Sequence, residues 1–125
     1  MGWEFAELLG MRPKSMGDGR ARFELEVASK HLNPNGVLHG GVIYSLADTA
    51  MGAALFSLLD GRDQCSTLEI KMNYLLPVTG GTIAAEASVV ERSKRIGVLE
   101  ARVFGDGNRM VALATGTFYI QTART

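Results

Sequence analysis

The residues that could take part in chemistry gather between positions 31 and 50. This segment holds both histidines of the chain, His31 and His39, the pair Gly40-Gly41 and one acid, Asp48, and it runs into a strongly apolar stretch. A carboxylate in the middle of an apolar helix must be desolvated unless it faces a cleft or an interface. Backbone N–H groups at a helix start are free to bind a partially negative oxygen, and glycines leave them accessible. Free donors near a lone acid indicate a reaction site.

Simpler interpretations of these residues stay open at this point. Asp48 could lie on an ordinary solvated face of a helix and bond to Ser45 or Thr49. The two histidines could supply two ligands to a metal ion, but no third ligand is evident, so we expect no metal. Cys65 stands at the start of an expected strand, where a small buried hydrophobic residue is more common than a nucleophile.

Composition and motifs exclude several classes of protein. The 13 basic and 13 acidic side chains cancel, and we expect no nucleic-acid partner. Elbow-type serine hydrolases, P-loop proteins and the usual zinc sites have no signature in this chain. The apolar run from Gly41 to Leu59 carries Asp48, which argues against a membrane span. The single cysteine and the N-terminus, which lacks a secretory signal pattern, predict a cytoplasmic protein.

One long helix is expected to position the site. The segment from Val42 to Leu59 is long enough and rich enough in Ala, Leu and Met to form it. At 100° per residue, the apolar side chains cover about half of the circumference. Asp48 lies on the narrower polar face with Ser45, Thr49 and Gly52. Such a helix is buried on more than one side.

Strand patterns surround this helix. Polar and apolar residues alternate over residues 22–27 and again from Thr67 to Leu76, and each pattern predicts a strand with one buried face. In the second of these strands the expected buried residues are Leu68, Ile70, Met72, Tyr74 and Leu76. Further strands are expected over residues 82–92, 96–104 and 110–121, with a weak strand over 11–16 after a short amphipathic helix from Trp3 to Leu9. An antiparallel sheet curved around one central helix, an α+β fold, satisfies these patterns as one domain over residues 1–125.

Helix geometry adds a constraint on the site. Gly40 and Asp48 are eight residues apart, about 12 Å along one helix, which is too far for both to contact one carbonyl group. If two copies pair about a two-fold axis with antiparallel central helices, Gly40 of one copy lies beside Asp48 of the other. The small residues Ala47, Gly52 and Ala53 are compatible with such close pairing. We therefore expect two equivalent sites at a dimer interface.

Two short motifs carry a resemblance to a known family. The sequence Asn33-x-x-Gly36-x-x-His39-Gly40-Gly41, followed by Leu46-Ala47-Asp48, resembles the hotdog-fold acyl-CoA thioesterases of the phenylacetate-pathway, or PaaI-like, type. The likeness extends over nearly the whole chain and implies a hotdog fold, in which a curved antiparallel sheet wraps around one long helix. It also implies an acyl-CoA substrate, a homodimer or a dimer of dimers, and no cofactor beyond the coenzyme A of the substrate.

The resemblance implies a role for each matching residue. Asp48 would be the catalytic carboxylate, either as a general base that activates water or as a nucleophile. The N–H of Gly40 would hold the thioester oxygen as it becomes an oxyanion. Asn33 would help to place water or the thioester, with a simple turn residue as the alternative. His39 would orient the loop, touch the thioester or only pack, and Thr67 would lie near the attacking water or be an ordinary strand-edge threonine.

A compact basic cluster is a candidate for binding the coenzyme A phosphates. Arg92, Lys94 and Arg95 surround Ser93 on an expected hairpin connection, where long side chains can reach a surface-bound anion. The helix start at Gly41 is a second candidate for substrate contact under the same resemblance. The alternative for the cluster is ordinary solvated charge on a hairpin.

We therefore expect an acyl-CoA thioesterase that releases a free carboxylic acid and CoA. A hotdog dehydratase or hydratase is the nearest alternative, but its usual His-Phe-x-Gly and Pro-Gly segments are absent from residues 31–48. A non-catalytic acyl-CoA-binding subunit, in which Asp48 is structural, is the alternative from another class. Aryl-acetyl, benzoyl and medium-chain acyl groups all fit the sequence.

Overall fold

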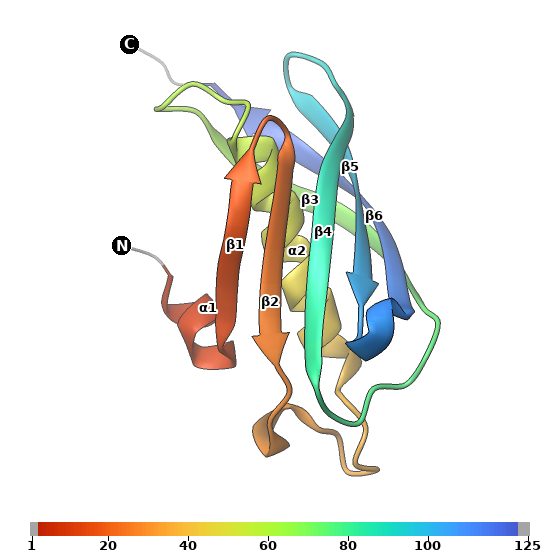
Figure 1. Cartoon of the computed structure of the whole chain (residues 1–125). Coiled ribbons are helices and arrows are strands. Elements are labelled where there is room, and N and C mark those ends of the chain that lie inside the picture. The colour runs from red at the N-terminus through yellow and green to blue at the C-terminus, as the bar shows by residue number, and fades with distance from the viewer. Residues whose placement is uncertain (1–2, 123–125) are drawn as a thin grey trace.

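A six-stranded antiparallel sheet forms the body of the molecule in a computed structural model that describes residues 3–122 (Figure 1). Its strands are β1 (Met11–Gly17), β2 (Arg20–Glu26), β3 (Gln64–Tyr74), β4 (Thr82–Arg92), β5 (Ile96–Phe104) and β6 (Met110–Gln121). They follow the order β1-β2-β4-β5-β6-β3, so β1 and β3 are the two edges. Two short 3₁₀ turns, Ser29–His31 and Asp106–Asn108, lie in connections.

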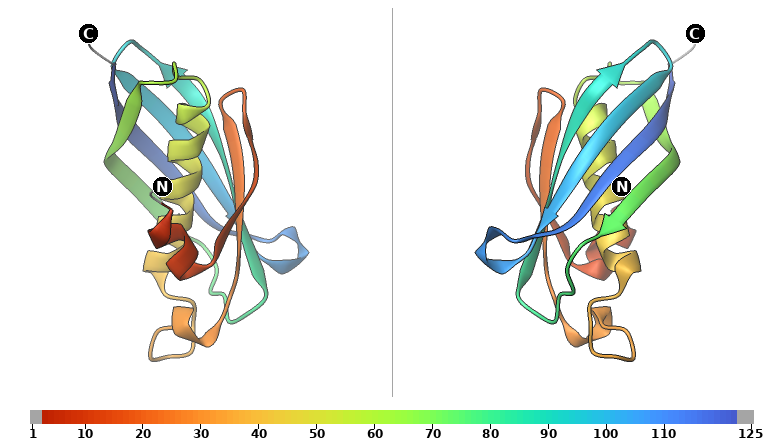
Figure 2. Two further views of the ribbon diagram at one scale, coloured as in Figure 1. Left: turned by 90° about the vertical axis from the view of Figure 1, so that its left-hand side faces the viewer. Right: turned by 90° about the vertical axis from the view of Figure 1, so that its right-hand side faces the viewer.

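The long helix α2 (Gly40–Phe56) packs against one face of this curved sheet (Figure 2). Its buried residues are Val42, Ile43, Leu46, Ala47, Ala50, Met51, Ala54 and Leu55. The helix starts before the predicted Val42 because a side chain caps its first turn. It ends before the predicted Leu59 because the Ser57 hydroxyl donates to the Ala54 carbonyl at 2.7 Å and accepts the Gly19 N–H at 2.9 Å. The central helix is confirmed, with both bounds shifted toward the N-terminus.

The short helix α1 (Glu4–Leu9) is held to the rest of the chain at its C-terminal end. The buried ring of His31 accepts the Ala28 N–H at Nδ1 and donates from Nε2 to the Leu9 carbonyl, 2.7 Å away. Lys30 donates to the neighbouring carbonyl of Leu8 at 3.0 Å. These contacts satisfy carbonyls that a helix end leaves unpaired.

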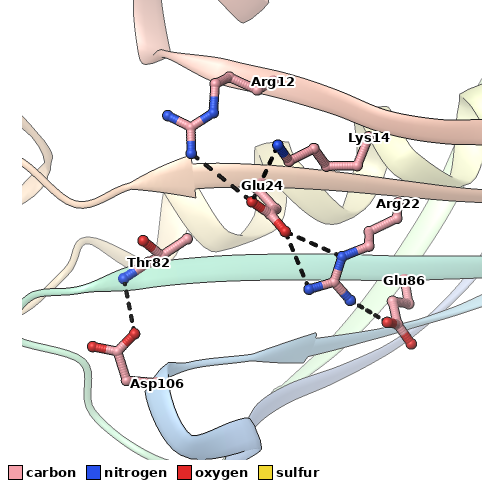
Figure 3. Close-up of polar contacts among 7 residues, drawn as sticks. All are labelled: Arg12, Lys14, Arg22, Glu24, Thr82, Glu86 and Asp106. Carbon is pink, nitrogen blue, oxygen red and sulfur yellow. Dashed lines mark hydrogen bonds and ion pairs between the residues drawn. The ribbon is translucent and has the colours of Figure 1, made fainter.

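Charged side chains of β1, β2 and β4 pair with one another on the outer face of the sheet, which points away from α2 (Figure 3). Glu24 on β2 lies 3.9 Å from both Arg12 and Lys14 on β1, and 3.2 Å from Arg22. Arg22 also pairs with Glu86 on β4. This solvated face explains the alternation of charged and apolar residues in β2, because every second residue points to the core.

The prediction for β3 is partly wrong. The strand forms, but Leu68 is 59% exposed, Tyr74 is 51% exposed and Leu76 lies beyond the end of the strand at 38% exposed. The register shifts between Thr67 and Glu69, so the alternation that the sequence pattern assumes is broken at Leu68. In addition, β3 is an edge strand, and no further strand of the described chain covers its free side.

The remaining predicted elements are confirmed. The predicted strands over residues 82–92, 96–104 and 110–121 coincide with β4, β5 and β6, and the weak strand over 11–16 is β1. One antiparallel sheet curved around one long helix is the hotdog fold that the sequence predicts. The predicted domain bounds of 1 and 125 lie outside the described residues. Within residues 3–122, no helix is both long and apolar enough to cross a membrane.

Candidate active site

The first turn of α2 leaves one backbone donor available. The Nδ1 of His39 accepts the N–H of Gly41 at 2.8 Å, so the histidine is the cap of the helix and its Nε2 carries the proton. Gly41 therefore uses its own N–H in this cap. Within residues 3–122, the N–H of Gly40 has no acceptor. Of the two predicted glycine donors, Gly40 is the one that can meet a ligand oxygen.

Asn33 organises the loop that leads into this helix. Its side-chain oxygen accepts the N–H of Asn35 at 2.9 Å and the N–H of Val37 at 3.2 Å. Its own N–H donates to the carbonyl of Val37 at 2.7 Å, and Gly36 between them adopts a left-handed φ of +76°. These contacts support the turn interpretation for the oxygen of Asn33, because both of its bonds stay within the loop.

Asp48 and Thr67 form the second group. Asp48 is half-buried in the middle of α2, and its Oδ1 accepts a hydrogen bond of 2.7 Å from the hydroxyl of Thr67 on β3. Ser45, one of the partners considered from the sequence, donates instead to the carbonyl of Gly41 at 2.8 Å. The contact with Thr67 fixes one carboxylate oxygen and leaves the other available to water or substrate.

A mostly apolar pocket of about 730 Å³ opens beside Asp48 and Thr67. Its other lining residues are Trp3, Met16, Thr49, Gly52, Ala53, Phe56, Gln64, Cys65 and Phe118. A Cβ atom added to Gly52 would lie 3.7 Å from the ring of Phe118, so this glycine leaves space open in the wall. Partial burial, and then the negative charge of Asp48, raises the pKa of the free Cys65 thiol.

One contact of the site has no signal in the sequence. The hydroxyl of Tyr74, at the end of β3, donates to the carbonyl of Gly40 at 2.8 Å. The two residues are 34 positions apart, and no local pattern links them. Trp3 and Phe118 were missed as pocket walls for the same reason, since they come from opposite ends of the chain.

The predicted site residues fall into three separate groups within one chain. Asn33, His39, Gly40 and Gly41 lie around the start of α2, whereas Asp48 and Thr67 lie near its middle. The β4–β5 hairpin with residues 92–95 lies at the end of the molecule where α2 finishes (Figure 1). Residues 92–95 are all exposed. Among the described residues, no three His, Cys, Asp or Glu side chains gather closely enough to hold a metal ion.

The predicted basic cluster is partly engaged in contacts within the hairpin. Arg92 donates to the carbonyl of Ser93 at 3.2 Å, and Arg95 donates to the hydroxyl of Tyr119 at 3.1 Å. The charged groups stay at the surface, where they can still meet an anion.

Comparison with known proteins identifies the family. The sequence profile of the thioesterase superfamily matches residues 35–112, which include the start of α2, Asp48 and Thr67. A 1,4-dihydroxy-2-naphthoyl-CoA hydrolase from Listeria monocytogenes is 27% identical over 94% of this chain and 96% of its own length.

Two solved structures are similar over almost their whole length. The conserved protein PA5202 from Pseudomonas aeruginosa is 40% identical, with a TM-score of 0.89 over 93% of this chain and 92% of its own. A variant of the phenylacetic acid degradation protein PaaI from Thermus thermophilus is 32% identical, with a TM-score of 0.86 over 93% and 97%. The chain therefore belongs to the thioesterase superfamily, as a hotdog-fold thioester hydrolase with PaaI among its structural neighbours.

Proposed function

We propose that this thioester hydrolase cleaves acyl-CoA to a free carboxylic acid and CoA, with Asp48 as the catalytic carboxylate. The observation that carries the proposal is the Asp48–Thr67 hydrogen bond of 2.7 Å at the mouth of an apolar pocket. As a general base, Asp48 takes a proton from water while the water oxygen adds to the thioester carbon. The C–S bond then breaks, and the CoA thiolate takes the proton. As a nucleophile, Asp48 attacks the thioester carbon, and the C–S bond breaks to release CoA and leave a mixed anhydride. Water then hydrolyses this anhydride to the free acid and restores the Asp48 carboxylate.

A second subunit would supply the oxyanion donor, the N–H of Gly40. This proposal is supported by the distance of about 12 Å along α2 between the two residues of one chain. It is also supported by the free edge of β3, where Leu68, Tyr74 and the following Leu75 are each about half exposed. Pairing of two β3 edges about a two-fold axis would cover these apolar side chains and set the α2 helices antiparallel. The assembly would be a homodimer or a dimer of dimers.

The two ends of the substrate would bind at different places. The pocket beside Asp48 has apolar walls from Trp3, Phe56 and Phe118, which suit an aryl or medium-chain acyl group. The phosphates of CoA would bind at the exposed hairpin of residues 92–95, which carries three cations. Such a substrate, together with the free thiol of Cys65, fits an enzyme of the reducing cytoplasm.

Thiol release from a panel of acyl-CoA substrates, measured on the wild type and on Asp48→Asn, tests the proposal. We expect turnover of aryl and medium-chain acyl-CoA, lost in Asp48→Asn with CoA binding retained. Asp60→Asn is the matched control, because Asp60 is an exposed acid just after α2. Unchanged hydrolysis by Asp48→Asn would sink the catalytic assignment. Water loss from a 3-hydroxyacyl-CoA without thiol release would instead favour a dehydratase, and binding without turnover a non-catalytic subunit.

A further inference from the structure

The edge strand β3 touches α2 through three side-chain hydrogen bonds. Cys65 contacts the carbonyl of Gly52 at 3.7 Å, Thr67 donates to Asp48 at 2.7 Å, and Tyr74 donates to the carbonyl of Gly40 at 2.8 Å. The last two contacts fall on the two groups that the proposed reaction needs. One strand thus contacts both the carboxylate and the peptide next to the free N–H.

The ring of Tyr74 also lies against the backbone of Gly40. A Cβ atom added to Gly40 would lie 3.1 Å from Cζ of the ring and 3.2 Å from its Cε1 and Oη. Glycine has no side chain that limits its own φ and ψ, so its peptide groups need restraint from outside. The tyrosine supplies this restraint by its hydrogen bond to the carbonyl, and its ring occupies the side of Gly40 on which a Cβ would stand.

The hydroxyl of Tyr74 is suited to act as a donor at neutral pH. Partial burial, and then the nearby Tyr44, raises the pKa of Tyr74 above its ordinary value. The phenol therefore keeps its proton through the neutral range, and the bond to the Gly40 carbonyl persists there.

We propose that Tyr74 is a positioning residue that fixes the direction of the Gly40 N–H, so that β3 of each subunit sets the carboxylate of one active site and the oxyanion donor of the other. Thr67 holds the carboxylate and Tyr74 holds the oxyanion donor. Stabilisation of an oxyanion depends on donor geometry, and a misplacement of about 1 Å can lower a rate by roughly 10². The inference rests on the proposed function of Gly40 and adds a residue outside the sequence motif.

Tyr74→Phe tests this role, because it removes the hydroxyl and keeps the ring. We expect kcat to fall about tenfold, a part of the effect of losing one donor, while KM changes by less than about twofold. Ser45→Ala is the matched control, since Ser45 also donates a hydroxyl to a first-turn carbonyl, that of Gly41, but within α2. The control should keep the kcat of the wild type. The amide proton resonance of Gly40 should shift in Tyr74→Phe and stay in place in Ser45→Ala, whatever the activity.

A double-mutant cycle with Gly40→Ala shows whether Tyr74 acts through Gly40. The added methyl would lie 3.1 Å from the Tyr74 ring, so the ring must shift by a few tenths of an ångström. If Tyr74 acts only through Gly40, the double variant should lose no more than the worse single variant. Each of three results would overturn the inference. The first is a kcat of Tyr74→Phe within twofold of that of the control, and the second is a Gly40 amide resonance that does not move. The third is a double variant in which the kcat losses of the two single variants multiply. The inference would also be overturned if the kcat of Tyr74→Phe returned to the wild-type value at protein concentrations at which sedimentation shows that the protein is fully dimeric. Failure of the proposed function can be told apart from failure of this inference, because Asp48→Asn would then hydrolyse acyl-CoA at the wild-type rate.

Discussion

Replacement of Gly40 by proline removes the proposed oxyanion donor and also adds a Cβ, whose effect Gly40→Ala measures separately. Gly40 is the first residue of α2, a position at which proline is well accepted. The preceding His39 has φ −63° and ψ 132°, the extended conformation that a residue before proline favours. Gly40→Ala is the matched control, because it adds a Cβ at the same place, 3.1 Å from the Tyr74 ring, and keeps the N–H.

The size of the effect follows from what each variant removes. Loss of one oxyanion donor lowers kcat by about 10² to 10³, or roughly 2.7 to 4 kcal/mol of transition-state stabilisation. We expect this loss for Gly40→Pro and about a tenfold loss for Gly40→Ala, which disturbs the donor only through Tyr74. The thermal midpoint should change little in Gly40→Pro, because the first N–H groups of a helix have no partner within the helix.

Steady-state thiol release, followed with a chromogenic disulfide, measures both variants against the wild type. Sedimentation and thermal unfolding show whether each variant keeps its assembly and fold. A kcat of Gly40→Pro within about threefold of that of Gly40→Ala would refute the reasoning, because the N–H would then contribute almost nothing beyond the space around it.

Three further outcomes are expected. Thr67→Val removes the 2.7 Å bond to Asp48 and should lower kcat about tenfold, with thermal unfolding as the check on folding. The pKa of Cys65 is raised, first by burial and then by Asp48. The thiol should therefore react slowly with iodoacetamide at neutral pH, and Asp48→Asn should move the pH profile of alkylation to lower pH but not below that of an ordinary thiol. Gly52→Ala, with its Cβ 3.7 Å from Phe118, should keep activity. Gly52→Leu should lose aryl and medium-chain substrates but keep acetyl-CoA, and equal losses on both would count against an acyl pocket there.

Much of the fold is readable from local patterns. The bounds of β4, β5 and β6 follow from the connections at residues 80–81, 93–95 and 105–108 between apolar or alternating segments, and α2 follows from its wide apolar arc. The burial of β3 was not readable, because the register shift beside Leu68 and the edge position are set by pairing with β6 and not by the strand itself.

Only some of the site residues can be recognised from the sequence. Asp48 and Gly40 stand out in the sequence because a lone carboxylate and a glycine at a helix start have few structural reasons to be there. Which of the neighbouring donors stays free depended on the side chain of His39, which takes the N–H of Gly41. The contact of Tyr74 with Gly40 joins residues that only the pairing of α2 with β3 brings together.

Mixing two inactive variants tests the proposed two-subunit site most directly. Dimers with one Asp48→Asn subunit and one Gly40→Pro subunit would hold one site with both defects and one intact site. After random exchange of equal amounts, half of the dimers would be mixed, and about a quarter of the wild-type activity should return. Activity that stays at the level of the two parent variants, in dimers shown by mass spectrometry to be mixed, would mean that each chain closes its own site and would contradict the account.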